Sequence, residues 1–351
     1  MTVNVNILAI VFLFASLFNV FAQGFASLGK TDQSFSNIDK NLIISFPEDH
    51  GPHPDFRIEW WYFTANLKNL QNKPIGVQWT LFRTALASQD NNNEGWSNKQ
   101  VWIGHAATTD ESDHLFSEKI ARGGINQAGV SVIPFNAWID DWYIKGENWE
   151  KLELSANTEN FQVFLELEAM GPIVKHGKNG LSFKSATGNA SAYYSQPFFK
   201  AQGWVKKNGS IERVEGTAWA DREWSSQPLA EDQLGWDWFS MNLNTDDKLM
   251  LFRVRGDSDN NFASATWIDK HGKPTSLSSS DIIFQPLSEN EKFFPILWRI
   301  EIPKLNINLT AEALNPDSFM DTFVPYWEGP IKISGSHEGN GYLEMTGYSQ
   351  K

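Results

Sequence analysis

The stretch GTAWADREWSSQPLAEDQLGWDWF, residues 216–239, places charged side chains among tryptophans on both sides of a polar segment. Its charged and aromatic members are Asp221, Arg222, Glu223, Asp237, Trp219, Trp224, Trp236, Trp238 and Phe239. Burying charges among indole rings costs free energy unless the charges pair or accept hydrogen bonds. A strand that needed only a packed face would use Val, Ile or Leu. The composition therefore indicates a working site as well as a pair of strands.

A second stretch of the same character, DHGPHPDFRIEWWYF, occupies residues 49–63. It sets His50, His53 and Glu59 beside Trp61 and Tyr62. We expect the two stretches to meet where two barrels join, and to form one site there.

The rest of the chain alternates between apolar and polar residues with a period of two, which predicts β-strands. Polar turns punctuate the alternation, and Asn208-Gly209 is a strong hairpin signal. We see no long segment of helical period. Strands at this spacing predict antiparallel barrels or sandwiches, and with this length we predict an all-β chain of two barrels. The predicted domains are residues 41–228 and 229–351, with the boundary in the polar segment that holds Pro228.

The N-terminus has the pattern of an export signal. Residues 7–18, ILAIVFLFASLF, match the apolar core of a signal peptide, and Val20 and Ala22 precede a plausible cleavage point. We predict a signal peptide over residues 1–22 and a flexible leader over residues 23–40, so that the mature protein is periplasmic or secreted and has no integral membrane span. An uncleaved anchor is the alternative.

Charge and composition exclude several classes of partner. The formal net charge is −13, which disfavours nucleic acid and anionic membrane surfaces. The chain has no cysteine, so neither a disulfide framework nor a cysteine nucleophile is available. Aromatic residues make up 14% and include 16 Trp. They fit either large β-sheet cores or a cavity for an apolar ligand.

His50 and His53 stand three residues apart in a loop rich in Gly and Pro. Two imidazoles at this spacing could share a metal with a nearby carboxylate, but no third histidine follows at a familiar metal-binding distance. We expect no metal and no cofactor. The histidines would instead orient the loop through a carboxylate, or act as a general acid or base.

Carboxylates with a predicted catalytic role lie on both strands. Alternation puts Glu59, Trp61 and Phe63 on one face of their strand. If that face is buried, we expect burial to raise the pKa of Glu59 and suit it to proton donation; if it points outward, Glu59 is a solvated surface residue. Asp221 and Glu223 share a face as well, where they could supply an acid and a base or form structural ion pairs.

A last segment, YWEG at residues 326–329, repeats the combination of aromatic and carboxylate residues. It adds Tyr326 and Glu328 to the predicted ligand-binding residues. The full predicted set comprises catalytic Asp221, Glu59, His50, His53 and Glu223, with ligand-binding Trp61, Tyr62, Arg222, Trp224, Trp236, Asp237, Tyr326 and Glu328.

Motifs along nearly the whole chain resemble the carotenoid 1,2-hydratase / AttH-like family of lipocalin-like proteins, which are also labelled secreted hydrolases. They include DHGPHPDFRIEWWYFTANL, IGHAATTD, YYSQPF, GTAWADREWSSQPL, GWDWFSMNL, YWEGPIKISG and GYLEMTGY. The resemblance implies two consecutive lipocalin-like barrels and, for its carotenoid branch, addition of water to an isoprenoid double bond. It also implies a link with lipid-exporting ABC transport systems.

Under this resemblance Asp221 or Glu59 would be the acid, and His50 or His53 the base or orienting group. Trp61, Trp224 and Trp236 would form the aromatic lining. In the carotenoid branch a histidine follows the aspartate of the central motif, whereas this chain has Arg222 there. Because an arginine stays protonated in proteins, Arg222 cannot shuttle a proton.

Two hypotheses of different classes follow. The first is an exported enzyme that carries out cofactor-independent hydration or hydrolysis of a hydrophobic lipid or isoprenoid-like substrate. The second is a carrier that holds an apolar ligand in the cell envelope without changing it. A structural protein whose tryptophans only fill two cores is a third reading.

Overall fold

The computed structural model describes residues 34–88, 95–227, 229, 232–257 and 261–348. Their regular structure consists of antiparallel β-strands joined by turns and by 3-10 turns at Glu48–His50 (η2), Gly95–Ser97 (η3), Ser279–Asp281 (η5) and Pro303–Leu305 (η6). Within these ranges, no helix is long and apolar enough to cross a lipid bilayer. The predicted signal peptide and the first part of the leader lie outside the described residues.

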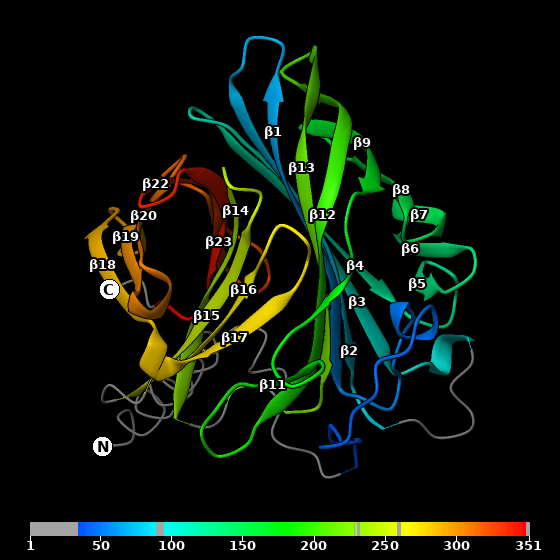
Figure 1. Ribbon diagram of the computed structural model, residues 1–351. Helices are drawn as coiled ribbons and strands as arrows, with labels where there is room; N and C mark the ends of the chain where they lie inside the picture. The colour runs from blue at the N-terminus through cyan, green and yellow to red at the C-terminus, as the bar shows by residue number, and fades with distance from the viewer. Residues whose placement is uncertain (1–33, 89–94, 228, 230–231, 258–260, 349–351) are drawn as a thin grey trace, which may run out of the picture.

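The strands form two sheets, each curved as a barrel (Figure 1). The first sheet contains β1 (Ile58–Asn69), β2 (Pro74–Ala85), β3 (Gln100–Thr109), β4 (His114–Arg122), β5 (Ala128–Ser131), β6 (Phe135–Ile139), β7 (Trp142–Asn148), β8 (Lys151–Asn157), β9 (Phe161–Ala169), β10 (Val174–Lys175), β11 (Leu181–Phe183), β12 (Ala190–Lys207) and β13 (Ser210–Ser225). Its order is β4-β3-β2-β1-β13-β12-β9-β8-β7-β6-β5. Because β6 also approaches β2, β3 and β4, this barrel is nearly closed.

The second sheet forms a half-barrel. It contains β14 (Gln233–Leu243), β15 (Lys248–Gly256), β16 (Phe262–Ile268), β17 (Pro274–Ser278), β18 (Ile283–Glu289), β19 (Pro295–Ile302), β20 (Ile307–Ala313), β21 (Phe319–Met320), β22 (Tyr326–Gly335) and β23 (Gly339–Met345). Its order is β17-β16-β15-β14-β23-β22-β20-β19-β18. The all-β architecture with two lipocalin-like barrels is confirmed, and the change of sheet falls between Ser225 and Gln233.

The hairpins follow the turn signals of the sequence. At the β12–β13 turn, Asn208 has φ 51° and Gly209 has φ 75°, the left-handed pair that a two-residue hairpin with native twist requires. Residues 114–122, for which the sequence allowed a strand or a short helix, form strand β4.

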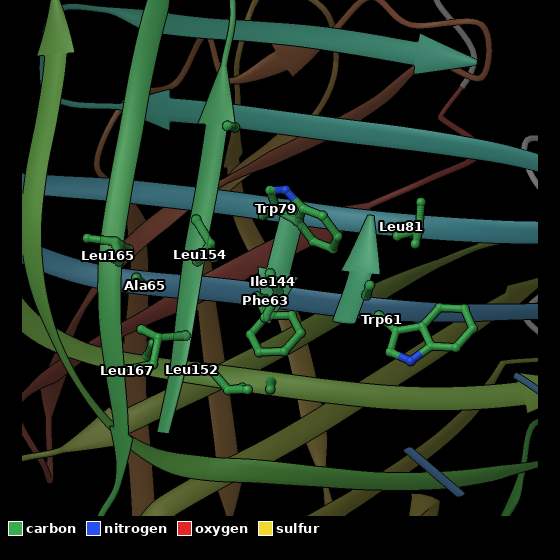
Figure 2. Close-up of a cluster of buried hydrophobic side chains, with 14 of the residues drawn as sticks. Trp61, Phe63, Ala65, Trp79, Leu81, Ile144, Leu152, Leu154, Leu165 and Leu167 are labelled. Atoms are coloured by element: carbon green, nitrogen blue, oxygen red, sulfur yellow. The ribbon is translucent and has the colours of Figure 1, made fainter. Parts of the chain in front are cut away.

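The first barrel encloses a large apolar core. Figure 2 shows Trp61, Phe63 and Trp79 from β1 and β2 in one buried cluster with leucines of β8 and β9. Phe35 is also buried, and Arg57 lies over its ring at 5.9 Å. Phe35 is the one buried residue among residues 34–40, and the flexibility that we expected of the leader as far as residue 40 stays a prediction.

The two barrels pack through the outer faces of their central strands. β1 approaches β23, and β2 approaches β22. A separate buried cluster fills this junction, with Tyr62, Tyr193 and Trp219 from the first barrel and Trp238 and Phe252 from the second among its members. The junction therefore has its own core, distinct from the interior of either barrel.

Candidate active site

The two tryptophan-rich stretches of the sequence pair directly with each other. Strand β1 runs antiparallel to β13, with Trp60 opposite Glu223, Trp61 opposite Arg222 and Tyr62 opposite Asp221. Successive side chains of a strand point to opposite faces of its sheet. The stretches meet as the sequence predicts, but the sheet divides their functional groups between two environments.

The inner environment lies at one end of the first barrel. Glu59, which is fully buried, forms ion pairs with Arg83 and Arg222, and both of its carboxylate oxygens accept hydrogen bonds from the backbone N–H of His53. Although burial acts to raise it, the pKa of Glu59 lies well below its usual range because two guanidinium groups face the carboxylate. The expectation that burial would raise this pKa is wrong, since a desolvated carboxylate with two cationic neighbours stays ionised.

The same guanidinium groups hold the loop that precedes β1. Nη2 of Arg83 donates to the carbonyl oxygens of His53 and Phe56, at 2.9 and 2.7 Å. Arg222 donates to the carbonyl oxygen of Gly51 and lies over the Trp61 ring at 3.7 Å. This network fastens the loop onto the barrel, which is a structural task.

The two histidines of this loop make different contacts, and only the His53 imidazole joins the network of Glu59 and Arg222. His50 stacks on Trp149 with ring centroids 4.2 Å apart, and its Nδ1 lies 2.7 Å from the Tyr194 hydroxyl. Burial, helped by the charge of Arg222, lowers the pKa of His50 to about 3. His53 stacks on Trp224 at 3.8 Å and lies 3.0 Å from Asp49. Among the described residues, no group of three or more His, Asp or Glu side chains is arranged to hold a metal ion.

The outer environment is a pocket of about 120 Å³ between the barrels. Its walls carry the carboxyl groups of Asp221, Glu223 and Glu344, together with the ammonium group of Lys184. The aromatic residues that line it are Trp60, Tyr62, Phe82, Tyr193, Trp236, Trp238 and Phe252. Carboxyl groups that converge in a mostly aromatic pocket are typical of a binding or active site.

The two barrels contribute equivalent walls to this pocket. In the first, Trp60 stands opposite Phe82 on β2 and Glu223 on β13. In the second, Trp238 stands opposite Phe252 on β15 and Glu344 on β23. Each wall has a buried ion pair behind it, Glu59 with Arg83 in the first barrel and Asp237 with Arg253 in the second.

Of the three acids whose carboxyl groups face the pocket, Asp221 is the most deeply buried, with 2% of its surface exposed. Burial raises its pKa to about 7, against the hydrogen bonds that its carboxylate accepts from Ser195 and from Nε1 of Trp219. Ser195 in turn lies 2.6 Å from Nε2 of His176, whose Nδ1 contacts Thr266 at 2.9 Å. His176 and Ser195 thus orient Asp221; neither lines the pocket.

Glu344 is the second acid with a shifted pKa. Burial and the neighbouring charges of Asp221 and Glu223 raise the pKa to about 7, although the carboxylate accepts a hydrogen bond of 2.7 Å from Nε1 of Trp236. Glu223 is held differently, since it forms an ion pair of 2.8 Å with Lys184. Two carboxyl groups that titrate near neutral pH in one pocket can serve as an acid and a base.

The pocket accounts for some of the predicted site residues and leaves others elsewhere. It brings together Tyr62, Asp221, Glu223 and Trp236. Glu59 borders it, but alternation directs the Glu59 carboxylate into the barrel. The side chains on the barrel side of the β1–β13 sheet are Trp61, Arg222, Trp224, His50 and His53. Their catalytic and binding roles stay predictions, and their contacts favour a structural task.

Asp237, Tyr326 and Glu328 lie outside the pocket as well. Asp237 is fully buried in the second barrel, where it pairs with Arg253 and accepts a hydrogen bond of 2.8 Å from the Tyr348 hydroxyl. Tyr326 and Glu328 are buried behind Tyr62 at the barrel junction.

Sequence reasoning missed Glu344, Lys184, Tyr193 and Trp238 as site residues. One signal in the sequence could have found Trp238: DWFSM at residues 237–241 repeats the acidic-aromatic pattern of EWWYF at residues 59–63. Trp238 would then have led to Glu344, its partner on the neighbouring strand. Lys184 lies between β11 and β12, and no pattern in its surroundings marks it.

Comparisons with known proteins agree with this architecture. The AttH-like family matches residues 37–348. The crystal structure of a protein of Nitrosomonas europaea that carries the name AttH superposes with a TM-score of 0.81 and 32% identity, over 90% of this chain and 99% of that chain. No curated protein sequence matches this chain.

Two more distant structures share the fold. Kievitone hydratase from Nectria haematococca has a TM-score of 0.65 and 17% identity, over 94% of this chain and 99% of that chain. The protein CghA has a TM-score of 0.53 and 11% identity, over 91% of this chain and 97% of that chain. At these identities the likeness shows the fold alone.

Proposed function

This chain belongs to the AttH-like family, and from that premise we propose that it is a hydratase-like enzyme that adds water to a hydrophobic, isoprenoid-like substrate between its two barrels. The observation that carries the proposal is the pair Asp221 and Glu344, two acids whose pKa values are raised to about 7 in one aromatic pocket. At neutral pH such a pair can hold one proton and one negative charge.

Hydration of an alkene needs both a protonated carboxyl group and an ionised carboxylate. The protonated carboxyl group gives its proton to one carbon of the double bond, and the electron pair of that bond forms the new C–H bond. The other carbon becomes cationic and is stabilised by the electron-rich faces of the surrounding rings. A water molecule then bonds to this carbon while the ionised carboxylate takes the surplus proton. The sum is alkene plus water to alcohol, and the pocket ends with as many protons as it had at the start.

This chemistry uses protons and water and draws on no cofactor. Asp221 is the group we assign as acid, because Ser195 and Trp219 hold its carboxyl in place and burial favours its protonated form. Glu344 is then the base. Glu223 forms an ion pair with Lys184, and its carboxylate helps to raise the pKa values of Asp221 and Glu344.

A carrier function is the second candidate. The pocket walls are largely aromatic, and a ligand could rest there unchanged. Binding would then depend on Trp60, Trp236 and Trp238, and exchanging a carboxyl group for an amide would leave affinity unaltered.

The experiment that separates the two is mass spectrometry of organic extracts from the native protein and from its Asp221→Asn variant. A lipid that only the variant retains is a trapped substrate, and this result supports the proposal that the protein is an enzyme. The same lipid bound to both proteins supports the carrier function. Glu166→Gln, which changes an exposed carboxylate, is the control for non-specific retention.

A defined probe completes this test. Kievitone, the compound for which the hydratase of Nectria haematococca is named, is incubated with each protein in ¹⁸O-labelled water. A product heavier by one labelled water, formed by the native protein and roughly 10²- to 10⁴-fold more slowly by Asp221→Asn, supports hydration.

We further propose that the protein is exported and cleaved near Gln23, which the apolar run at residues 7–18 supports. The mass of the mature chain in the exported fraction tests this. A lipid-exporting ABC transport system as partner is likewise a proposal, supported by the family resemblance.

A further inference from the structure

Lys184 brings an ammonium group to the wall of the pocket between the barrels. The residue directly follows β11, and its backbone is held on both sides. Its N–H donates to the carbonyl oxygen of Asn189 at 2.7 Å, and its carbonyl oxygen accepts a hydrogen bond of 2.9 Å from Nε2 of Gln233. Only 19% of the side chain is exposed. The ammonium group therefore has a defined position in the pocket wall.

Aromatic rings of both barrels flank this ammonium group. Nζ lies 4.8 Å from the centre of the Tyr193 ring on β12 and 4.2 Å from the centre of the Phe252 ring on β15. Ring faces attract the charge, yet they do not replace the hydrogen bonds that an ammonium group makes with oxygen atoms. The Glu223 carboxylate contacts Nζ at 2.8 Å, and an ammonium group has further N–H donors. An oxygen atom of a ligand can accept from them.

Glu223 sets an acceptor beside this donor. Its carboxylate lines the same pocket and is nearly buried. A hydroxyl group donates one hydrogen bond and accepts others, so it can accept from the ammonium group and donate to the carboxylate. An anionic ligand group can only accept, and it would also meet the carboxyl groups of Asp221, Glu223 and Glu344 in this pocket. The ion pair therefore favours a neutral hydroxyl group over a carboxylate or a phosphate.

The neighbouring strand adds a hydroxyl group that has no partner. Ser191 on β12 stands opposite Ser182 of β11, two residues before Lys184, and alternation puts it on the same face of β12 as Tyr193. Ser191 lines the pocket and is buried, and within the described residues its Oγ makes no hydrogen bond. Buried hydroxyl groups are normally hydrogen-bonded. A polar ligand group in this part of the pocket can supply the partner that Ser191 lacks.

We propose that Lys184, Glu223 and Ser191 form a subsite for a hydroxyl group of the ligand, and that the ligand is a neutral isoprenoid-like alcohol. Its oxygen accepts from the Lys184 ammonium group, and its O–H donates to the Glu223 carboxylate. The hydrocarbon part then lies against the aromatic walls of the pocket, which include Trp236 and Trp238. The subsite selects alcohols from among hydrophobic molecules of similar size.

This subsite deepens the proposed function and rests on it for the reaction that follows binding. An alcohol held by its oxygen presents its hydrocarbon part, with the double bond, to the rest of the wall, which carries Asp221 and Glu344. Anchoring one end of a flexible molecule in this way reduces the positions that the double bond can take. Recognition of the hydroxyl group can be measured without any turnover.

The test is equilibrium binding to the whole protein near neutral pH, followed by quenching of tryptophan fluorescence. The probes are geraniol, its methyl ether and geranic acid, which share one hydrocarbon skeleton. The ether cannot donate to Glu223, and the acid is an anion. We expect the native protein to bind geraniol about tenfold or more tightly than either of the other two. Geranic acid or the ether binding as tightly as geraniol would overturn the subsite.

Two variants locate the recognition. Lys184→Met keeps an unbranched apolar side chain and removes the donor, so geraniol should bind about tenfold or more weakly. The hydrocarbon that has a hydrogen atom in place of the hydroxyl group should keep its native affinity. Ser191→Ala loses no hydrogen bond of the free protein and should fold as the native chain does, with geraniol bound about threefold or more weakly. Native affinity for geraniol in both variants refutes the assignment.

Lys145→Met is the matched control. Lys145 also pairs with a glutamate, Glu153, at 3.5 Å and lies over the Tyr143 ring at 4.2 Å, but outside this pocket. Its geraniol affinity should equal that of the native protein, and a loss as large as that of Lys184→Met would count against the subsite.

The subsite and the hydratase can fail separately. If geraniol is preferred and yet neither geraniol nor kievitone gains labelled water, the subsite stands and the hydratase proposal fails. If kievitone is hydrated while geraniol and geranic acid bind equally, the subsite fails and the hydratase proposal stands.

Discussion

Asp221 and Arg222 are consecutive residues of β13, yet their side chains lie on opposite faces of the first sheet. Asp221 stands in the wall of the pocket between the barrels, and Arg222 reaches into the barrel to pair with Glu59. The sheet that separates them places the Asp221 carboxyl group in the pocket and the Arg222 guanidinium group in the interior of the first barrel. This separation leads to predictions that distinguish the two faces.

Asp221→Asn should change how stability depends on pH. The pKa of Asp221 is about 7 in the folded protein and 3.8 as an ordinary carboxyl. Between these values the folded state binds a proton that the unfolded state has lost, so stability falls as pH rises. The native protein should lose about 2–3 kcal/mol relative to the variant between about pH 5 and pH 8, measured by urea unfolding. A constant difference across this range would contradict the raised pKa.

Glu59→Gln should destabilise the protein strongly. The variant leaves the guanidinium groups of Arg83 and Arg222 buried without their counter-charge, at a cost of about 3–5 kcal/mol. The pKa of Glu59 is depressed, so its contribution is present above its ordinary value of 4.5 and is lost as pH falls below it. Urea unfolding near neutral pH measures the loss. Glu166→Gln, on the exposed face of β9, should stay within about 0.5 kcal/mol of the native protein.

Trp236→Phe should raise the pKa of Glu344 above about 7, because the indole N–H that donates to this carboxylate holds the pKa down. The ring remains, so the pocket keeps most of its shape. Titration of ¹³C-labelled glutamate by NMR measures the shift. Trp238→Phe is the control, since its indole N–H donates to the Tyr193 hydroxyl and not to a carboxylate. Equal shifts in both variants would mean that pocket shape, and not the hydrogen bond, sets the pKa.

Arg222→His should cost stability without altering the acids of the pocket. A histidine cannot replace the ion pair with Glu59 together with the hydrogen bonds to the backbone of Gly51 and Trp60, and we expect a loss of about 3–5 kcal/mol. The pKa of Asp221, followed by NMR in the folded variant, should stay at about 7 because the sheet lies between the two groups. A stable variant with an altered Asp221 titration would show that this position does act on the pocket.

Much of the architecture was available from the sequence because strand alternation is a local property. The hairpin at Asn208-Gly209 and the shared face of Asp221 and Glu223 needed only the neighbouring residues. The family resemblance, which rests on motifs along the chain, predicted the correct fold class.

Strand alternation could not predict how deeply each charged side chain is buried. The pattern assigned Glu59, Trp61 and Phe63 to one face, but whether that face met a barrel core, the pocket or solvent depended on closure of the sheet. The pKa of Glu59 fell where burial alone would have raised it, because Arg83 and Arg222 come from other strands.

The sequence by itself determined that this is an all-β chain with two barrels. It also determined that the two tryptophan-rich stretches, with their charged side chains, would meet. Only the tertiary structure decided that the pocket lies between the barrels and that Glu344 completes it. The physical reason is that a pKa and a pocket are set by distances through space, and β23 reaches β14 only when the second sheet forms.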